Sequence, residues 1–246
     1  MEAYSDFAEV YDLFMEDVPY DEWTDFIITK LSEYGVKDGL VLDLGCGTGE
    51  ITMRLSDKGF DMIGVDLSPD MLNIANSKKG ERDILYLNQD MCSFELYGTV
   101  RAVVCICDSV NYVTEPEDLL ECFRLVNNYL DPDGIFIFDF NTDYKYAEVI
   151  GDCTIAENRD EASFIWENTY YPEEHINEYE ITVFKKQGEL YSKFSETHYQ
   201  RGYTVEEMKG LIEKAGMVFL DCIDADDDEP GQRFRIIARE KGKNGE

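Results

Sequence analysis

The sequence predicts an α/β fold built on a mostly parallel sheet of seven strands, with helices on both faces. Short apolar runs alternate with helical stretches from residue 39 to residue 139, which is typical of buried parallel strands joined by covering helices. Residues 154–199 instead alternate apolar and polar side chains, which indicates an antiparallel insertion. With 246 residues, 44% of them hydrophobic, the chain is long enough to bury a large core.

The N-terminal segment, residues 1–36, is expected to form a helical lid. Apolar residues within 7–14 have the spacing of one helix face, and those within 23–31 repeat it. Pro19 stands between the two stretches, where a second helix can start. The segment contains ten acidic residues and one basic residue, so the lid should be strongly negative.

Residues 37–150 and 202–246 should form the main body. Its helices are expected after residue 49, after the Ser68 cap, over 116–130 and over 204–215, where Thr204 and Glu207 have capping-box spacing. Its seven strands are expected at 40–44, 60–66, 84–87, 102–107, 135–139, 217–223 and 234–238.

The segment 151–201 is expected to be an antiparallel β insert that caps the acceptor site. Its strand candidates are 154–156, 163–171, 178–186 and 190–199. The sequence Lys-Gln-Gly-Glu at 186–189 predicts a hairpin turn between the last two.

Composition excludes several functions. Lys+Arg 22 against Asp+Glu 53 gives a formal net charge of −31, which disfavours nucleic-acid binding and anionic membranes. No apolar run is long enough for a transmembrane helix, and the acidic start is unlike a signal peptide, so we expect a cytoplasmic protein. Seven cysteines in apolar runs read as reduced thiols, and two histidines give no support for a zinc site, so no metal is expected.

Residues 41–50, with the sequence VLDLGCGTGE, are the most informative stretch. A strand leads into a glycine-rich turn and then a helix, which brings backbone N–H groups and a positive helix end to a cleft. Asp66 ends the next strand, where a carboxylate reaches ribose hydroxyls. The spacing Gly45-x-Gly47-x-Gly49 differs from G-x-G-x-x-G, and the preceding Asp43 would repel a pyrophosphate but attract an ammonium group.

These residues resemble the class I S-adenosylmethionine-dependent methyltransferases. The resemblance implies a Rossmann-like fold, S-adenosyl-L-methionine as the cofactor, and methylation as the activity. Flanking residues are similar to a subgroup of small bacterial methyltransferases with an antiparallel β insert. The blocks that carry the family resemblance are 41–50, 64–72 (GVDLSPDML), 89–91 (QDM) and 107–109 (CDS), and those that carry the subgroup resemblance are 4–12, 19–23 and 196–203.

The resemblance implies a cofactor role for fourteen residues, which are Tyr11, Trp23, Asp43, Gly45, Cys46, Gly47, Gly49, Asp66, Leu67, Gln89, Asp90, Met91, Cys107 and Asp108. Asp43 would face the amino group of the cofactor, Asp66 its ribose and Asp90 its adenine. Cys107 and Asp108 would line the methionine end. Each also has a purely structural interpretation, as a strand end, a turn residue, a helix cap or a core aromatic.

Candidates on the acceptor side are few. Methyl transfer to an ammonium or hydroxyl requires removal of a proton, and His198 on the last insert strand or Tyr11 from the lid are candidates for that step. Tyr4 and Arg201 are candidates for substrate binding. The alternative for His198 is a surface strand of mixed charge.

Three functions remain open at this point. The first is a methyltransferase that acts on the N or O nucleophile of a small molecule. The second acts on RNA or protein, but neither the lid nor the insert supplies a basic track. The third is a non-catalytic sensor that binds S-adenosylmethionine. The acidic lid and insert favour neutral or amine-bearing acceptors, whereas the choice between a monomer and a homodimer stays undetermined.

Overall fold

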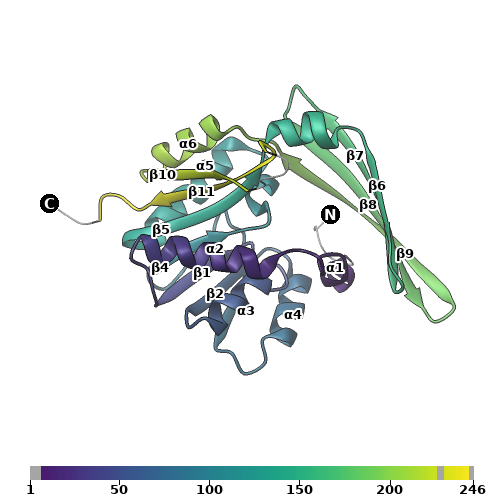
Figure 1. Ribbon diagram of the computed structural model, residues 1–246, viewed down its shortest axis with the longest axis horizontal. Helices are drawn as coiled ribbons and strands as arrows, with labels where there is room; N and C mark the ends of the chain where they lie inside the picture. Colours follow the sequence, from purple (N-terminus) through teal and green to yellow (C-terminus); the bar gives the residue numbers. More distant parts are fainter. Residues whose placement is uncertain (1–6, 226–229, 244–246) are drawn as a thin grey trace.

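The computed structural model describes residues 7–225 and 230–243 and contains two sheets (Figure 1). Strands of the larger sheet follow the order β10-β11-β5-β4-β1-β2-β3. The pairs from β3 through β5 are parallel, whereas β11 runs antiparallel to both β5 and β10, so the mostly parallel seven-stranded sheet is confirmed. The strands are β1 Leu40–Leu44, β2 Asp61–Asp66, β3 Ile84–Asn88, β4 Val100–Cys105, β5 Leu130–Asn141, β10 Val218–Asp224 and β11 Arg233–Arg239.

Helices cover both faces of this sheet. In β1, the side chains of Leu42 and Leu44 pack with α5 and α6, whereas Val41 packs with α2 and α3 on the opposite face. Burial on both faces explains why these strands read as continuous apolar runs. The helices are α2 Tyr20–Glu33, α3 Glu50–Asp57, α4 Pro69–Lys78, α5 Pro116–Tyr129 and α6 Val205–Lys214.

The predicted helix starts are confirmed, and two local features differ from prediction. Ser68 Oγ accepts a hydrogen bond from Met71 N at 3.2 Å, and Thr204 forms a capping box with Glu207. Residues 131–134, between the helix expected over 116–130 and the strand expected at 135–139, lie inside β5, because the register between β4 and β5 shifts and the extra residues bulge out of the ladder. A π-helix at Lys145–Ile150 was not predicted, since it leads into the insert and lacks a clear apolar period.

The smaller sheet is the antiparallel insert, with the strand order β6-β7-β8-β9. Its strands are β6 Thr154–Asn158, β7 Ala162–Tyr171, β8 Ile176–Gln187 and β9 Leu190–Arg201. Helix α1, Ala8–Phe14, packs one apolar face onto this sheet, where Phe7 and Val10 meet Phe164 and Ile181. Figure 1 shows α1 between the insert and α4. The N-terminal helix therefore belongs to the junction between the two sheets. Among the described residues, no helix combines the length and apolarity needed to cross a bilayer.

Candidate active site

A cavity of about 360 Å³ lies beyond the carboxyl ends of β1, β2 and β4. This is the edge at which open parallel sheets bind ligands, because the loops after neighbouring strands diverge there. Eleven of the fourteen expected cofactor residues line it, namely Tyr11, Asp43, Gly45, Cys46, Gly47, Asp66, Leu67, Gln89, Asp90, Met91 and Cys107. The motif blocks are distant in sequence, and the fold brings them to one cavity.

The glycine turn after β1 forms the floor of the cavity. Gly45 and Gly49 have φ of 76° and 82°, which favour glycine. A Cβ on Gly45 would lie 2.7 Å from Cβ of Ser109, and a Cβ on Gly49 would collide with the Tyr86 hydroxyl. The turn thus packs closely against Ser109 and Tyr86, whereas a Cβ on Gly47, which lines the cavity, would meet no atom within 4 Å and leaves open space against the backbone.

Asp66 is held by this turn. Its Oδ2 accepts from Gly47 N at 2.7 Å, and its Oδ1 accepts from Ser68 N at 2.8 Å. Burial raises the pKa of Asp66, and these N–H groups oppose that shift. A carboxylate offers about four acceptor sites, so two N–H bonds leave capacity for the two hydroxyls of a ribose.

Asp43 is the more perturbed carboxyl. It is 2% exposed, and its Oδ2 accepts from Thr52 Oγ1 at 2.5 Å. Burial raises the pKa of Asp43 to about 7, and the hydrogen bond from Thr52 opposes the shift. An amino group placed in the cavity beside it would favour the ionised form.

The far end of the cavity suits an aromatic ring. Leu67 is 67% exposed although it is apolar, and it lines the cavity together with Met91. Asp90 Oδ1 accepts from Cys92 N at 2.8 Å, so the turn after β3 orients this carboxylate. The Gln89 side chain bonds the backbone of Glu95 and holds the same turn.

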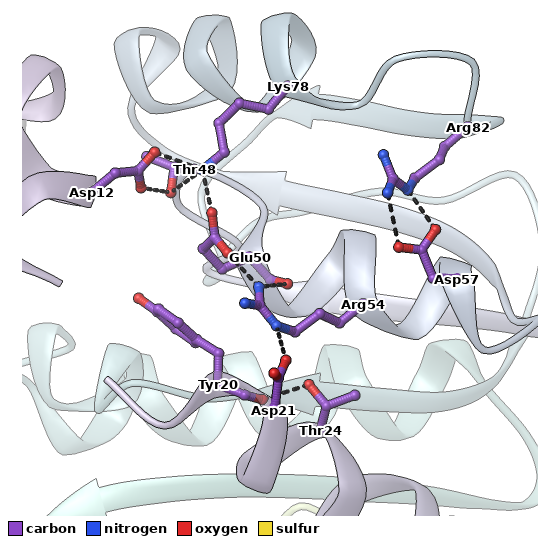
Figure 2. A network of polar contacts seen from close by, with 10 residues as sticks. All are labelled: Asp12, Tyr20, Asp21, Thr24, Thr48, Glu50, Arg54, Asp57, Lys78 and Arg82. Carbon is purple, nitrogen blue, oxygen red and sulfur yellow. Dashed lines mark hydrogen bonds and ion pairs between the residues drawn. The ribbon is translucent and has the colours of Figure 1, made fainter. Parts of the chain in front are cut away.

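Helices α1 and α2, which form the predicted lid, are joined to α3 and α4 by a charged network (Figure 2). Lys78 of α4 donates to Asp12 of α1 at 2.6 Å and also to Glu50 of α3. Arg54 bridges Glu50 to Asp21 of α2, with 2.7 Å between Arg54 Nε and Asp21 Oδ1. Both lid helices are therefore tied to the helices that follow β1 and β2.

Five predicted site residues within the described part of the chain do not line the cavity. Trp23 instead lies beneath the Arg233 guanidinium, 4.7 Å from its ring centroid. Gly49 faces Tyr86, Asp108 bonds Gln200, and the Arg201 guanidinium donates to Glu174 O. Tyr4 lies outside the described residues. The remaining one is His198.

His198 is 2% exposed and packs behind the cavity wall. Its ring stacks on Tyr179 at 4.8 Å, its Nε2 lies 3.3 Å from Glu196 Oε2, and the Tyr179 hydroxyl bonds the hydroxyl of cavity-lining Tyr112. The predicted surface strand is wrong at this position, because His198 is buried, whereas its role in removing the acceptor proton stays a prediction. The rings of Tyr112 and Tyr179 pack against the imidazole, and Tyr112 is the one that lines the cavity.

Two tyrosines of the cavity wall were missed by sequence reasoning. Tyr20 begins α2 and Tyr112 ends the 3₁₀ helix Ser109–Tyr112. Tyr20 is three residues before Trp23 on the same helix, and only tertiary packing determines which of the two rings faces the cavity. The block 19–23 contains both Tyr20 and Trp23, but its pattern does not show which of the two rings faces the cavity.

Known proteins match this chain over both sheets. Residues 41–134 match the family described as "Methyltransferase domain". The chain is 41% identical over 215 residues to "Putative methyltransferase YqeM" of Bacillus subtilis (strain 168), across 87% of this chain and 85% of that protein. An S-adenosylmethionine-dependent methyltransferase from Clostridium acetobutylicum ATCC 824 has 31% identity and a TM-score of 0.87, across 98% of this chain and 100% of that one.

The fold is also shared with a more distant enzyme. S-adenosylmethionine-bound CalS10, an amino pentose methyltransferase from Micromonospora echinaspora, has a TM-score of 0.77 at 17% identity. The match covers 98% of this chain and 99% of CalS10, so it includes the antiparallel insert.

Proposed function

Because the chain belongs to the class I S-adenosylmethionine-dependent methyltransferases, we propose that it methylates a nitrogen or oxygen of a small molecule, with an amine as the favoured acceptor. The observation that carries this proposal is a cavity whose wall contains three tyrosines and five acidic residues. S-adenosylmethionine supplies an activated methyl group, so the protein mainly has to align the acceptor and exclude water.

The cofactor half of the cavity fits S-adenosylmethionine in its donor set. We assign the ribose hydroxyls to Asp66, whose carboxylate is preoriented by two N–H groups. We assign the amino group to Asp43 and the adenine to the apolar pair Leu67 and Met91 with Asp90. The glycine turn leaves room for the methionine part against the backbone.

The acceptor would bind where three tyrosines enter the cavity. Tyr11, Tyr20 and Tyr112 come from α1, α2 and the 3₁₀ helix, outside the motif blocks shared by the family. Burial raises the pKa of Tyr20 and the charges of Cys107 and Glu50 raise it further, so its hydroxyl stays a neutral hydrogen-bonding group. A neutral phenol at Tyr20 orients an acceptor without removing its proton.

The titratable groups of this wall favour an amine over a hydroxyl. Burial raises the pKa of Glu50, but the hydrogen bonds from Lys78 and Arg54 outweigh the effect of burial and lower the pKa below its ordinary value. Glu50 is therefore an ion-paired carboxylate rather than a general base. A hydroxyl acceptor needs a base during attack, whereas an amine attacks with its own lone pair once neutral. The formal net charge of −31 favours the approach of amine cations. The amino pentose acceptor named for CalS10 supports the same class.

The alternatives predict different outcomes. An RNA-directed enzyme needs a basic surface, and Arg54 and Lys78 instead form salt bridges with acidic residues of α2 and α1. A protein-directed enzyme would transfer the methyl group to a protein pool. A sensor would bind the cofactor without transfer.

The test is a transfer assay with tritiated methyl donor against pools of amines, amino sugars, hydroxyl compounds, bulk tRNA and protein. We expect label in an amine pool and none in tRNA. Asp66→Ala should abolish cofactor binding by calorimetry, with Asp61→Asn, on an exposed position of β2, as the control. Tight cofactor binding without label in any pool contradicts the methyltransferase assignment, and label only in tRNA or protein contradicts the small-molecule assignment.

A further inference from the structure

The turn after β4 has an unusual backbone. Cys107 and Asp108 have φ of 69° and 49°, and they are the only adjacent pair among the non-glycine positive-φ residues of the described chain. L-residues adopt this region singly and at a cost, which corresponds to about a tenfold factor in an equilibrium constant for each residue. Cys107 lines the cavity, so the costly backbone is part of the wall. Such geometry persists only where its surroundings enforce it.

One carboxylate enforces it. Asp139 of β5 is 1% exposed, and it accepts from Asp108 N at 2.7 Å and from Cys107 N at 3.4 Å. Successive N–H groups in this conformation form an anion-binding nest, and here the anion is the Asp139 side chain. These two hydrogen bonds stabilise the left-handed turn and would be lost if its backbone moved to another conformation.

Asp139 is itself paired with a cation from the neighbouring strand. Arg233 of β11 donates to Asp139 Oδ2 at 2.5 Å, and its guanidinium covers the ring of Trp23 from α2. Burial lowers the pKa of Arg233, but the charges of Asp139 and Asp108 outweigh it and raise the pKa, so the arginine stays charged. Trp23 therefore acts at a distance from the cavity, by covering the cation that holds Asp139.

The insert contributes a second hold on the turn. Gln200 of β9 donates to Asp108 Oδ2 at 2.7 Å, and Gln200 Oε1 accepts from the Tyr146 hydroxyl at 3.0 Å. Asp139 of β5 therefore holds the backbone of the turn, and Gln200 of the insert holds the side chain of Asp108.

We propose that Asp139 is a positioning residue that holds the Cys107–Asp108 turn in its left-handed form and thereby sets the affinity for the cofactor. The proposal rests on the cofactor site proposed above. In Asp139→Asn one oxygen can still accept, but the amide nitrogen cannot, and the charge opposite Arg233 is lost. The wall formed by Cys107 would then relax away from the ligand.

The test measures S-adenosylmethionine binding by calorimetry in four proteins: the wild type, D139N, C107G and D139N/C107G. We expect D139N to bind at least about tenfold more weakly. Glycine adopts positive φ without the penalty, so the D139N loss should be much smaller in the C107G background. Asp61→Asn is the matched control, and its affinity should equal that of the wild type.

Each outcome has a meaning. An equal D139N loss in both backgrounds, or wild-type affinity in D139N, overturns the proposal. If D139N alone does not fold, the cause is the Arg233 guanidinium that has lost its anion, so D139N/R233M, which removes this cation, is measured in its place, and wild-type affinity in that variant overturns the proposal. A wild type that binds the cofactor but labels no small molecule contradicts the proposed function and leaves this proposal standing.

Discussion

Cofactor binding should depend on pH through Asp43. This carboxyl lines the cavity, and burial raises its pKa to about 7. If the amino group of the cofactor pairs with the carboxylate, binding requires the ionised form and releases the proton. If the amino group did not pair with Asp43, the cofactor would bind equally well to the protonated and the ionised form of this carboxyl.

The magnitude follows from the fraction ionised. With a pKa of about 7, about half of Asp43 is ionised at pH 7 and about 3% at pH 5.5. The apparent Kd is the intrinsic Kd divided by this fraction, so binding should weaken about fifteenfold from pH 7 to pH 5.5. Both pH values lie below the ordinary pKa of an α-amino group, so the charge of the cofactor's amino group changes little between them.

The raised pKa of Asp43 also makes the stability of the protein depend on pH, and in the opposite direction: raising the pH strengthens cofactor binding but lowers the free energy of unfolding. The folded carboxyl holds its proton more tightly than the unfolded one, whose ordinary value is 3.8. The contribution of Asp43 to the free energy of unfolding is therefore complete below about pH 4 and is lost as the pH rises through about 7. At about 1.4 kcal/mol for each pKa unit, the loss is of the order of 4 kcal/mol.

Calorimetry at pH 5.5, 6.2 and 7.0, in buffers of different ionisation enthalpy, measures both the Kd and the protons released. Asp43→Asn should abolish the pH dependence, whereas Asp61→Asn should retain it. S-adenosylhomocysteine keeps the amino group and should show the same slope as S-adenosylmethionine. A wild-type Kd that changes less than about threefold over this range, or an unchanged slope in D43N, would refute the reasoning.

Two further predictions concern the turn and the lid. Gly49→Ala should lower the free energy of unfolding by about 1–3 kcal/mol more than Gly59→Ala does. Both glycines have positive φ, but only the Cβ at position 49 would meet the Tyr86 hydroxyl. Equal losses of the two variants in thermal unfolding would contradict this prediction. Lys78→Met should speed proteolysis of the N-terminal helices and weaken cofactor binding, whereas Arg82→Met, which breaks an ion pair away from the lid, should do neither (Figure 2); identical cleavage rates in the two variants would count against the lid network.

The order of elements and the cofactor half of the site were predictable because their signals are local. A buried parallel strand, a capped helix and a glycine turn each act within a few residues, as at Ser68 and Thr204. Parallel strands also end at one edge of the sheet, so motif residues after successive strands must meet. That is why Asp43, Asp66 and Asp90 were predicted to lie together, as they do around the cavity.

The acceptor half depended on contacts between segments that no local pattern relates. The sequence alone determined the fold class, the family resemblance and three of the carboxylates of the cavity, Asp43, Asp66 and Asp90. Only the tertiary structure decided that Tyr20 rather than Trp23 faces the cavity and that His198 lies behind a wall of rings. The physical reason is that these side chains are oriented by packing between α2, β9 and the body, where neighbours are distant in sequence and period alone leaves the facing residue open.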